Sequence, residues 1–70
     1  MAYSSEYFSR SLKVERTKRG WTQNDLANIS GVSLNAIAKY EIGAHIPSFD
    51  SVCKLATALG CPTDAFWERT

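Results

Sequence analysis

The sequence has few of the residues that catalysis and metal binding require. Its 70 residues include one histidine and two cysteines, Cys53 and Cys61. A structural zinc site takes four ligands at recognised spacings, which these three residues do not supply. The sequence also lacks a nucleophile with a base at a useful spacing and a glycine loop for phosphate. These absences argue against an enzyme and against a bound metal or other cofactor.

Long apolar runs are also missing. No stretch approaches the roughly 20 apolar residues that cross a bilayer, and residues 1–6 lack a basic region followed by an apolar one. We therefore expect a cytoplasmic protein that does not enter a membrane. Cys53 in mid-helix and Cys61 beyond the helix end lie too far apart for a disulfide, so both are expected to be small, buried hydrophobic side chains.

The net charge is only +1, but the charged residues are unevenly distributed. Residues 10–45 contain six basic and three acidic side chains, whereas residues 46–70 contain two and three. A positive field in the first part of the chain favours an anionic partner. The alternative is that pairs four residues apart, such as Glu15 and Arg19, only link neighbouring turns of a solvated helix.

A chain of this length forms one domain, here residues 1–70 with its core at about 8–68, and buries a small core. Helical spacing of apolar residues predicts a compact all-α domain of five helices without strands. The expected helices cover about 5–19, 23–30, 34–42, 49–59 and 63–68. The expected core positions are Phe8, Leu12, Leu26, Ala27, Ile37, Tyr40, Phe49, Val52, Leu55, Ala56 and Leu59.

Two helix starts follow each other closely in the middle of the chain. Thr22, with Asp25 three residues later, predicts a capping box, and Ser33 can cap the next helix. The turn between them, residues 30–32, contains Gly31, which takes a positive φ at little cost. Two helices joined by so short a turn form a helix-turn-helix. This motif displays its second helix, whose outer face can enter a major groove about 12 Å wide.

The second helix of the motif presents polar residues on its predicted outer face. If Ile37 faces the core, the outward positions are Leu34, Asn35, Ala38 and Lys39. The side chain of Asn35 matches adenine N6 and N7, and Lys39 can donate to guanine or to phosphate. The alternative is that both side chains are simply solvated.

Other residues near this face are expected to have supporting roles. Leu34 can contact a thymine methyl group, and the small Ala38 allows the helix to approach DNA closely. Ser33 can divide its hydroxyl between the helix cap and DNA. Gln23, in the first turn of the preceding helix, lies where free N–H groups and the helix dipole attract phosphate, although it can also merely tolerate that position.

Two charged residues lie in line with apolar positions of their own helices. Arg16 follows Leu12 by four residues, and Glu41 follows Ile37 by four. We interpret Arg16 and Glu41 as a partly buried ion pair that orients the second helix of the motif. Removing one partner of a deeply buried pair costs about 3–5 kcal/mol.

Taken together, these residues resemble the Cro/cI-type (Xre-like, lambda-repressor-like) helix-turn-helix family of phage and bacterial repressors. The resemblance, over about residues 8–68, rests on Leu12-Lys13, Arg16, Gly20-Trp21-Thr22-Gln23, Leu26-Ala27, Gly31-Val32-Ser33, Ile37, Lys39-Tyr40-Glu41, Gly43, Pro47-Ser48, Leu55-Ala56 and Leu59-Gly60. It implies a five-helix domain that binds operator DNA, usually as a two-fold dimer, through the second helix of the motif. It also implies that Gln23 contacts phosphate or braces the helices, and that Leu34, Asn35 and Lys39 occupy base-edge positions. It supports Arg16 and Glu41 as the internal ion pair.

The sequence departs from the family pattern just after the motif. Where the family often has Lys or Arg after the closing glycine, this chain has Ala44-His45-Ile46, so His45 and backbone amides are left to contact phosphate. Leu34 also replaces an often polar residue. We therefore expect a transcriptional regulator, a repressor acting at an inverted-repeat operator. The alternative is a protein-interaction module of the same fold, such as an antitoxin or anti-repressor component.

A module with so few basic residues binds DNA weakly alone, and pairing two recognition helices about 34 Å apart is the ordinary remedy. We therefore expect a homodimer. Phe66 and Trp67 are adjacent and are not expected to share one small core, so this segment, together with the end of the preceding helix and with Trp67 exposed, is the candidate dimer contact. The alternative is that Trp67 folds back to cover Phe49 or Leu59. We expect no small-molecule ligand, because no ligand-sensing segment follows the motif before Thr70.

Overall fold

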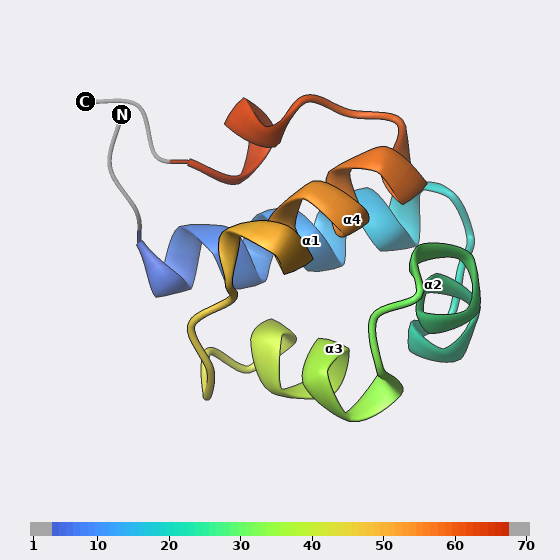
Figure 1. Ribbon diagram of the computed structural model, residues 1–70, viewed down its shortest axis with the longest axis horizontal. Coiled ribbons are helices and arrows are strands. Elements are labelled where there is room, and N and C mark those ends of the chain that lie inside the picture. The colour runs from blue at the N-terminus through green and yellow to red at the C-terminus, as the bar shows by residue number, and fades with distance from the viewer. Residues whose placement is uncertain (1–3, 68–70) are drawn as a thin grey trace.

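The computed structural model describes residues 4–67, which form helices and no strand. The elements are α1 (Ser5–Lys18), α2 (Gln23–Ser30), α3 (Leu34–Glu41), α4 (Phe49–Leu59) and the short 3₁₀ helix η1 (Thr63–Phe66), as Figure 1 shows. The expected count of five α-helices is therefore wrong. The last element is a single 3₁₀ turn of four residues, and the backbone is already extended at Trp67. Glu68, expected to end this helix, lies outside the described residues.

Side-chain caps explain where the four α-helices begin. Ser4, Thr22, Ser33 and Ser48 each accept a hydrogen bond from the backbone N–H three residues later. At α2 the predicted capping box is confirmed, because the Thr22 N–H also donates to Asp25 Oδ2 over 2.8 Å. Gly31, at φ +78°, ends α2 in the left-handed conformation. These local signals place α2 and α4 where the sequence predicted them, and α1 and α3 each end one residue earlier than expected.

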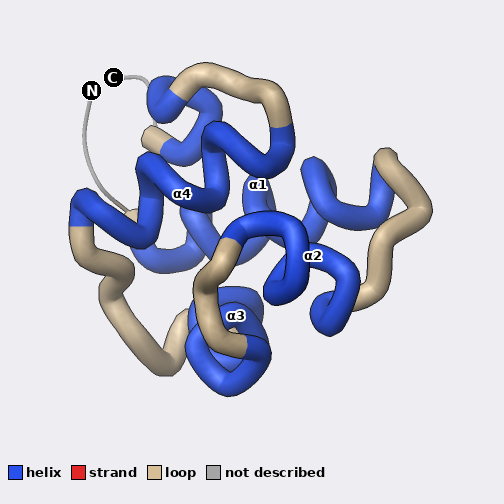
Figure 2. The backbone as a smooth tube through the Cα atoms, turned by 45° about the vertical axis from the view of Figure 1, so that its right-hand side comes forward, coloured by secondary structure: helices blue, strands red, loops and turns tan. Residues whose placement is uncertain are grey.

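The core forms where the helices meet around α1 and α3. α3 packs against α1 and α2, α2 also packs against α4, and η1 folds over α1 and α4 (Figures 1 and 2). The Phe8 ring contacts Tyr40 and Phe66 edge-on, at centroid distances of 5.7 and 5.4 Å. These rings join α1, α3 and η1. The buried core consists of Phe8, Leu12, Leu26, Val32, Ile37, Tyr40, Val52, Leu55, Ala56, Leu59 and Phe66.

The C-terminal aromatic residues do not divide between core and surface as expected. Phe66 is fully buried, and Trp67 is partly buried and also packs against the core. Both fit because the chain reverses after Gly60, where φ is +66°, and carries η1 back across α1. Of the two candidate dimer residues, Phe66 is therefore not accessible, and Trp67, expected to be exposed, is only partly so.

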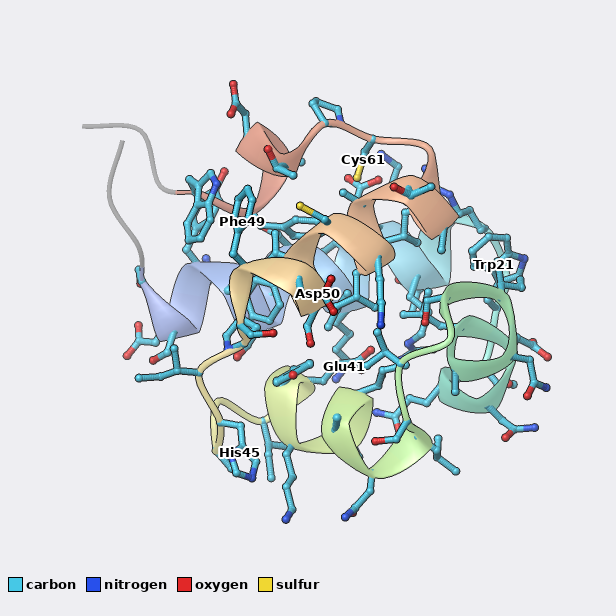
Figure 3. All side chains as sticks on the ribbon, in the orientation of Figure 1. Trp21, Glu41, His45, Phe49, Asp50 and Cys61 are labelled. Atoms are coloured by element: carbon cyan, nitrogen blue, oxygen red, sulfur yellow. The ribbon has the colours of Figure 1, made fainter. Side chains whose placement is uncertain are left out.

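Three further residues are less buried than the sequence suggested. Phe49 begins α4 and is 70 % exposed, because the buried stripe of this helix starts only at Val52. Figure 3 shows the Phe49 ring on the side of α4 that faces away from α3. Cys53 and Cys61 are free thiols and only half-buried, and burial raises the pKa of the Cys61 thiol.

Within residues 4–67 no helix combines the length and apolar character that a membrane span requires.

Candidate nucleic-acid interface

The second helix of the motif, α3, has one buried side and one open side. Ile37 is fully buried and Tyr40 is 7 % exposed, with its hydroxyl 3.3 Å from Ser51 Oγ. On the other side Leu34 is 44 % exposed and Asn35 is also exposed. In Figure 2, α3 is seen nearly end-on at the lower edge of the molecule, below α2 and α4. The helix is therefore fixed along one side and displayed along the other.

The remaining predicted contact residues of α3 lie at the border of the open side. Ala38 and Lys39 are half-buried, whereas the capping residue Ser33 is exposed. Ser33 Oγ accepts from the Ala36 N–H over 3.1 Å. Its hydroxyl hydrogen is not needed for this cap and can be donated to a ligand.

A shallow hollow of about 220 Å³ lies between α3 and the connection from α3 to α4. His45 lies in this connection and is exposed, at the lower edge of the molecule beside α3 (Figure 3). The hollow is lined by Ser33, Asn35, Ala36, Lys39, Tyr40, His45 and Ile46. The structure thus brings together four of the predicted contact residues, although they span 13 positions of the sequence.

A bidentate ion pair lies behind α3. Arg16 Nε is 2.7 Å from Glu41 Oε2, and Arg16 Nη2 is 2.9 Å from Glu41 Oε1. The Arg16 side chain is 12 % exposed and that of Glu41 is 3 % exposed. The hydrogen bonds to Glu41 raise the pKa of the Arg16 guanidinium, against the opposing effect of burial. The pair ties α1 to the end of α3.

The same cluster also holds the start of α2. Arg16 Nη1 donates to the Trp21 carbonyl over 2.7 Å, and Gln23 Nε2 donates to Glu41 Oε1 over 3.1 Å. The structure thus uses the Gln23 side chain to brace the helices. The sequence did not indicate the Trp21 carbonyl as a partner of Arg16. One guanidinium and one carboxylate therefore fix the relative positions of α1, α2 and α3.

Arg19 forms a second contact between helices, from the end of α1 to α4, that the sequence did not predict. Its guanidinium donates to Glu15, within α1, and to the Leu59 carbonyl at the end of α4. It also lies 6.0 Å from the centre of the Trp21 ring. The expected pairing of Glu15 with Arg19 is present at 3.0 Å, but it is part of this interhelical contact rather than only a solvated pair.

The basic side chains divide into paired and unpaired groups. Within residues 4–67, Arg16, Lys18, Arg19 and Lys54 each form an ion pair with a carboxylate. In the same part of the chain Arg10, Lys13 and Lys39 form none. Lys39 is therefore the unpaired cation of α3, and its ammonium is available to an anion at the open side of the helix.

Sequence comparison assigns this arrangement to a family. The HTH_3 helix-turn-helix family model matches residues 12–66. The chain belongs to this Xre-like (Cro/cI-type) family. The matched residues include the whole motif, the Arg16–Glu41 pair and α4.

Two curated regulators are similar to this Xre-like chain over most of its length. The SPbeta prophage-derived HTH-type transcriptional regulator YonR of Bacillus subtilis (strain 168) is 37% identical over 63 residues, or 90% of this chain. The HTH-type transcriptional regulator SutR of Escherichia coli (strain K12) is 32% identical over 62 residues, or 89% of this chain. The chain spans 58% of the length of YonR and 35% of that of SutR.

Solved structures show the same fold. The restriction-modification controller protein C.AhdI from Aeromonas hydrophila matches with a TM-score of 0.86 and 30% identity, covering 90% of this chain and 96% of C.AhdI. An HTH_3 family transcriptional regulator from Vibrio cholerae matches with a TM-score of 0.85 and 27% identity, covering 89% and 35% of the two chains. The four-helix arrangement with a short final turn is thus an Xre-like fold.

Proposed function

We propose that the protein binds double-stranded DNA at specific sequences and regulates transcription, with α3 inserted in the major groove. The observation that carries this proposal is the open side of α3, where Asn35 and Leu34 are exposed on a helix whose opposite side is buried. The similar proteins include transcriptional regulators and a restriction-modification controller protein, which supports the same function.

In this proposal the predicted contact residues of α3 and its surroundings, apart from Lys39, have defined roles. The N-terminal residues of a recognition helix reach the base edges, and Leu34 and Asn35 are the first two residues of α3. Asn35 pairs with adenine, Leu34 contacts a thymine methyl group, and the small Ala38 allows the helix axis to come close. Ser33 and His45 lie beside these residues and contact the sugar-phosphate backbone of the DNA.

In this proposal the start of α2 faces a second stretch of the DNA sugar-phosphate backbone. Helix N-termini bind phosphate through free N–H groups. The Gln23 side chain is engaged with Glu41, so its backbone N–H, rather than its amide, is the expected donor.

We further propose that the protein acts as a repressor and binds an inverted repeat as a homodimer. Two domains bound together gain affinity because the second binding event becomes intramolecular. Phe66 has no part in the dimer surface because it is buried. The half-buried Trp67 remains as the candidate dimer contact. Sedimentation with and without an operator duplex measures this state, and a monomer under both conditions at high micromolar concentration would contradict the dimer.

The decisive experiment is selection of bound duplexes from a random library, with the wild type, Asn35→Ala and the control Asn28→Ala. Asn28 is an exposed asparagine of α2 and has no base-reading role in the proposal. We expect the wild type to select one motif and Asn28→Ala to select the same motif. Asn35→Ala should lose preference at one adenine position, by about 1–3 kcal/mol.

Other outcomes would redirect the proposal. A uniform loss of affinity on every duplex would make Asn35 a positioning contact and not a reader. Failure to enrich any duplex would reject DNA binding and favour the alternative, an interaction module with a protein partner, for which the exposed Leu34 is the supporting observation. A binding constant that hardly changes with salt would point the same way, because each phosphate contact contributes about 0.9 to the slope of log K against log salt concentration.

A further inference from the structure

The chain has one histidine, and the structure places it at the hollow beside α3. His45 and Ile46 come from the connection between α3 and α4, and the other lining residues come from α3 and its cap. Ile46 is 76 % exposed and forms the apolar edge of the hollow. The imidazole therefore borders the same open surface as the proposed reading residues (Figure 3).

The charges that face this hollow have one sign. Lys39 lines it from α3, and no Asp or Glu of residues 4–67 lines it. The carboxylates nearby in sequence are engaged elsewhere: Glu41 is 3 % exposed and bound to Arg16, and Asp50 of α4 pairs with Lys54 at 3.2 Å. The hydroxyl of Tyr40 lies near Ser51 Oγ. An anion in the hollow would thus meet one permanent cation, one imidazole and no opposing charge.

We propose that the hollow holds one backbone phosphodiester of the DNA duplex, bound jointly by the Lys39 ammonium and the protonated imidazole of His45, so that DNA binding takes up a proton. This inference rests on the proposed function and assigns Lys39 to phosphate instead of a base edge. Both cations donate charge-assisted hydrogen bonds to phosphate oxygens. Histidine is the side chain that changes charge between pH 5 and 8, so the strength of this contact depends on pH.

Two measurable consequences follow. Affinity for duplex DNA should rise as the pH falls, by about tenfold per bound domain between pH 7.5 and 5.5, the effect of one added charge-assisted hydrogen bond. The dependence on salt should also become steeper at low pH. Because Lys39 already contacts the same phosphate, the added charge of His45 should increase the slope of log K against log salt concentration by at most about 0.9 per domain.

The test measures fluorescence anisotropy of a selected duplex titrated with the full chain, at both pH values and several salt concentrations. The matched variants are His45→Gln, which keeps a neutral hydrogen-bonding side chain, and His45→Lys, which stays charged at both pH values. We expect His45→Gln to bind equally at the two pH values with the affinity that the wild type has at the higher one. His45→Lys should bind tightly at both. Lys39→Ala should weaken binding to all sequences alike.

The outcomes separate this inference from the proposed function. If the wild type binds its selected duplex with a normal salt dependence but equally at both pH values, DNA binding stands and the proton-linked site is rejected. If His45→Gln retains the pH dependence, another group takes up the proton and the assignment to His45 is wrong. If Lys39→Ala changes the preferred base at one position, Lys39 is a reader and the joint phosphate site is rejected. If no duplex binds at either pH value, the proposed function itself fails.

Discussion

The two sides of α3 differ in how completely the rest of the protein uses them. On the inner side Ile37 lies in the core, and Glu41 receives hydrogen bonds from α1 and α2. On the open side Leu34 is 44 % exposed and Lys39 has no ion pair within residues 4–67. The inner contacts fix the direction of the helix, which leaves the outer residues free for a ligand. Substitutions on the inner side should therefore change stability, and those on the outer side should change only DNA binding.

The largest difference in stability is expected between substitutions of Ile37 on the inner side and Leu34 on the open side. Ile37→Ala should lower the free energy of unfolding by about 3–4 kcal/mol, because it leaves a cavity in the core. Leu34→Ala should change it by less than about 1 kcal/mol, because its side chain is largely solvated. Urea denaturation followed by circular dichroism measures both. Equal losses would show that α3 is not held as described.

The next largest effect on stability is expected from breaking the Arg16–Glu41 ion pair on the inner side. Arg16→Ala should lower the free energy of unfolding by about 3 kcal/mol, because Glu41 would keep an unpaired charge that is 3 % exposed. The matched control is Lys54→Ala, which breaks the pair with Asp50. Its side chains are 51% and 77% exposed, so the loss should be below about 0.5 kcal/mol. A control loss as large as that of Arg16→Ala would remove the distinction between the two pairs.

Ser33 lies at the border between the two sides. Substitutions at this position can distinguish its role as helix cap from its proposed contact with DNA. Ser33→Ala should lower the free energy of unfolding by about 1 kcal/mol, because the Ala36 N–H loses its acceptor. Ser33→Asp supplies another capping oxygen and should restore stability. It should nevertheless weaken DNA binding, because a carboxylate then faces the phosphates. If both variants kept full affinity, Ser33 would lie outside the DNA contact.

The smallest effect is expected at Gln23, which reaches the inner network from α2. Gln23→Ala should lower the free energy of unfolding by about 0.5–1 kcal/mol through loss of the hydrogen bond to Glu41. Asn24→Ala, at the exposed neighbouring position, should leave stability unchanged. Thermal unfolding and DNA titration are measured together. A loss of affinity with unchanged stability would assign the Gln23 amide to phosphate and not to bracing.

The sequence predicted the elements that depend on neighbouring residues. Thr22 with Asp25, and Ser33 with Gly31 before it, define the motif because caps and left-handed turns form within a few residues of chain. The register of Arg16 with Leu12, and of Glu41 with Ile37, placed both charges on inward-facing stripes. The structure contains an ion pair between them.

Only the tertiary structure decided how separate elements meet. It buried Phe66 against Phe8, left Phe49 exposed at the start of α4, and reduced the last expected helix to one 3₁₀ turn. It also gave the Gln23 amide to Glu41 and brought His45 to the hollow beside α3. Periodicity states which residues share a face, but whether that face is covered depends on a partner element distant in the chain. Local capping signals therefore determined the helices of this protein, and packing between distant elements determined which of their side chains remain exposed.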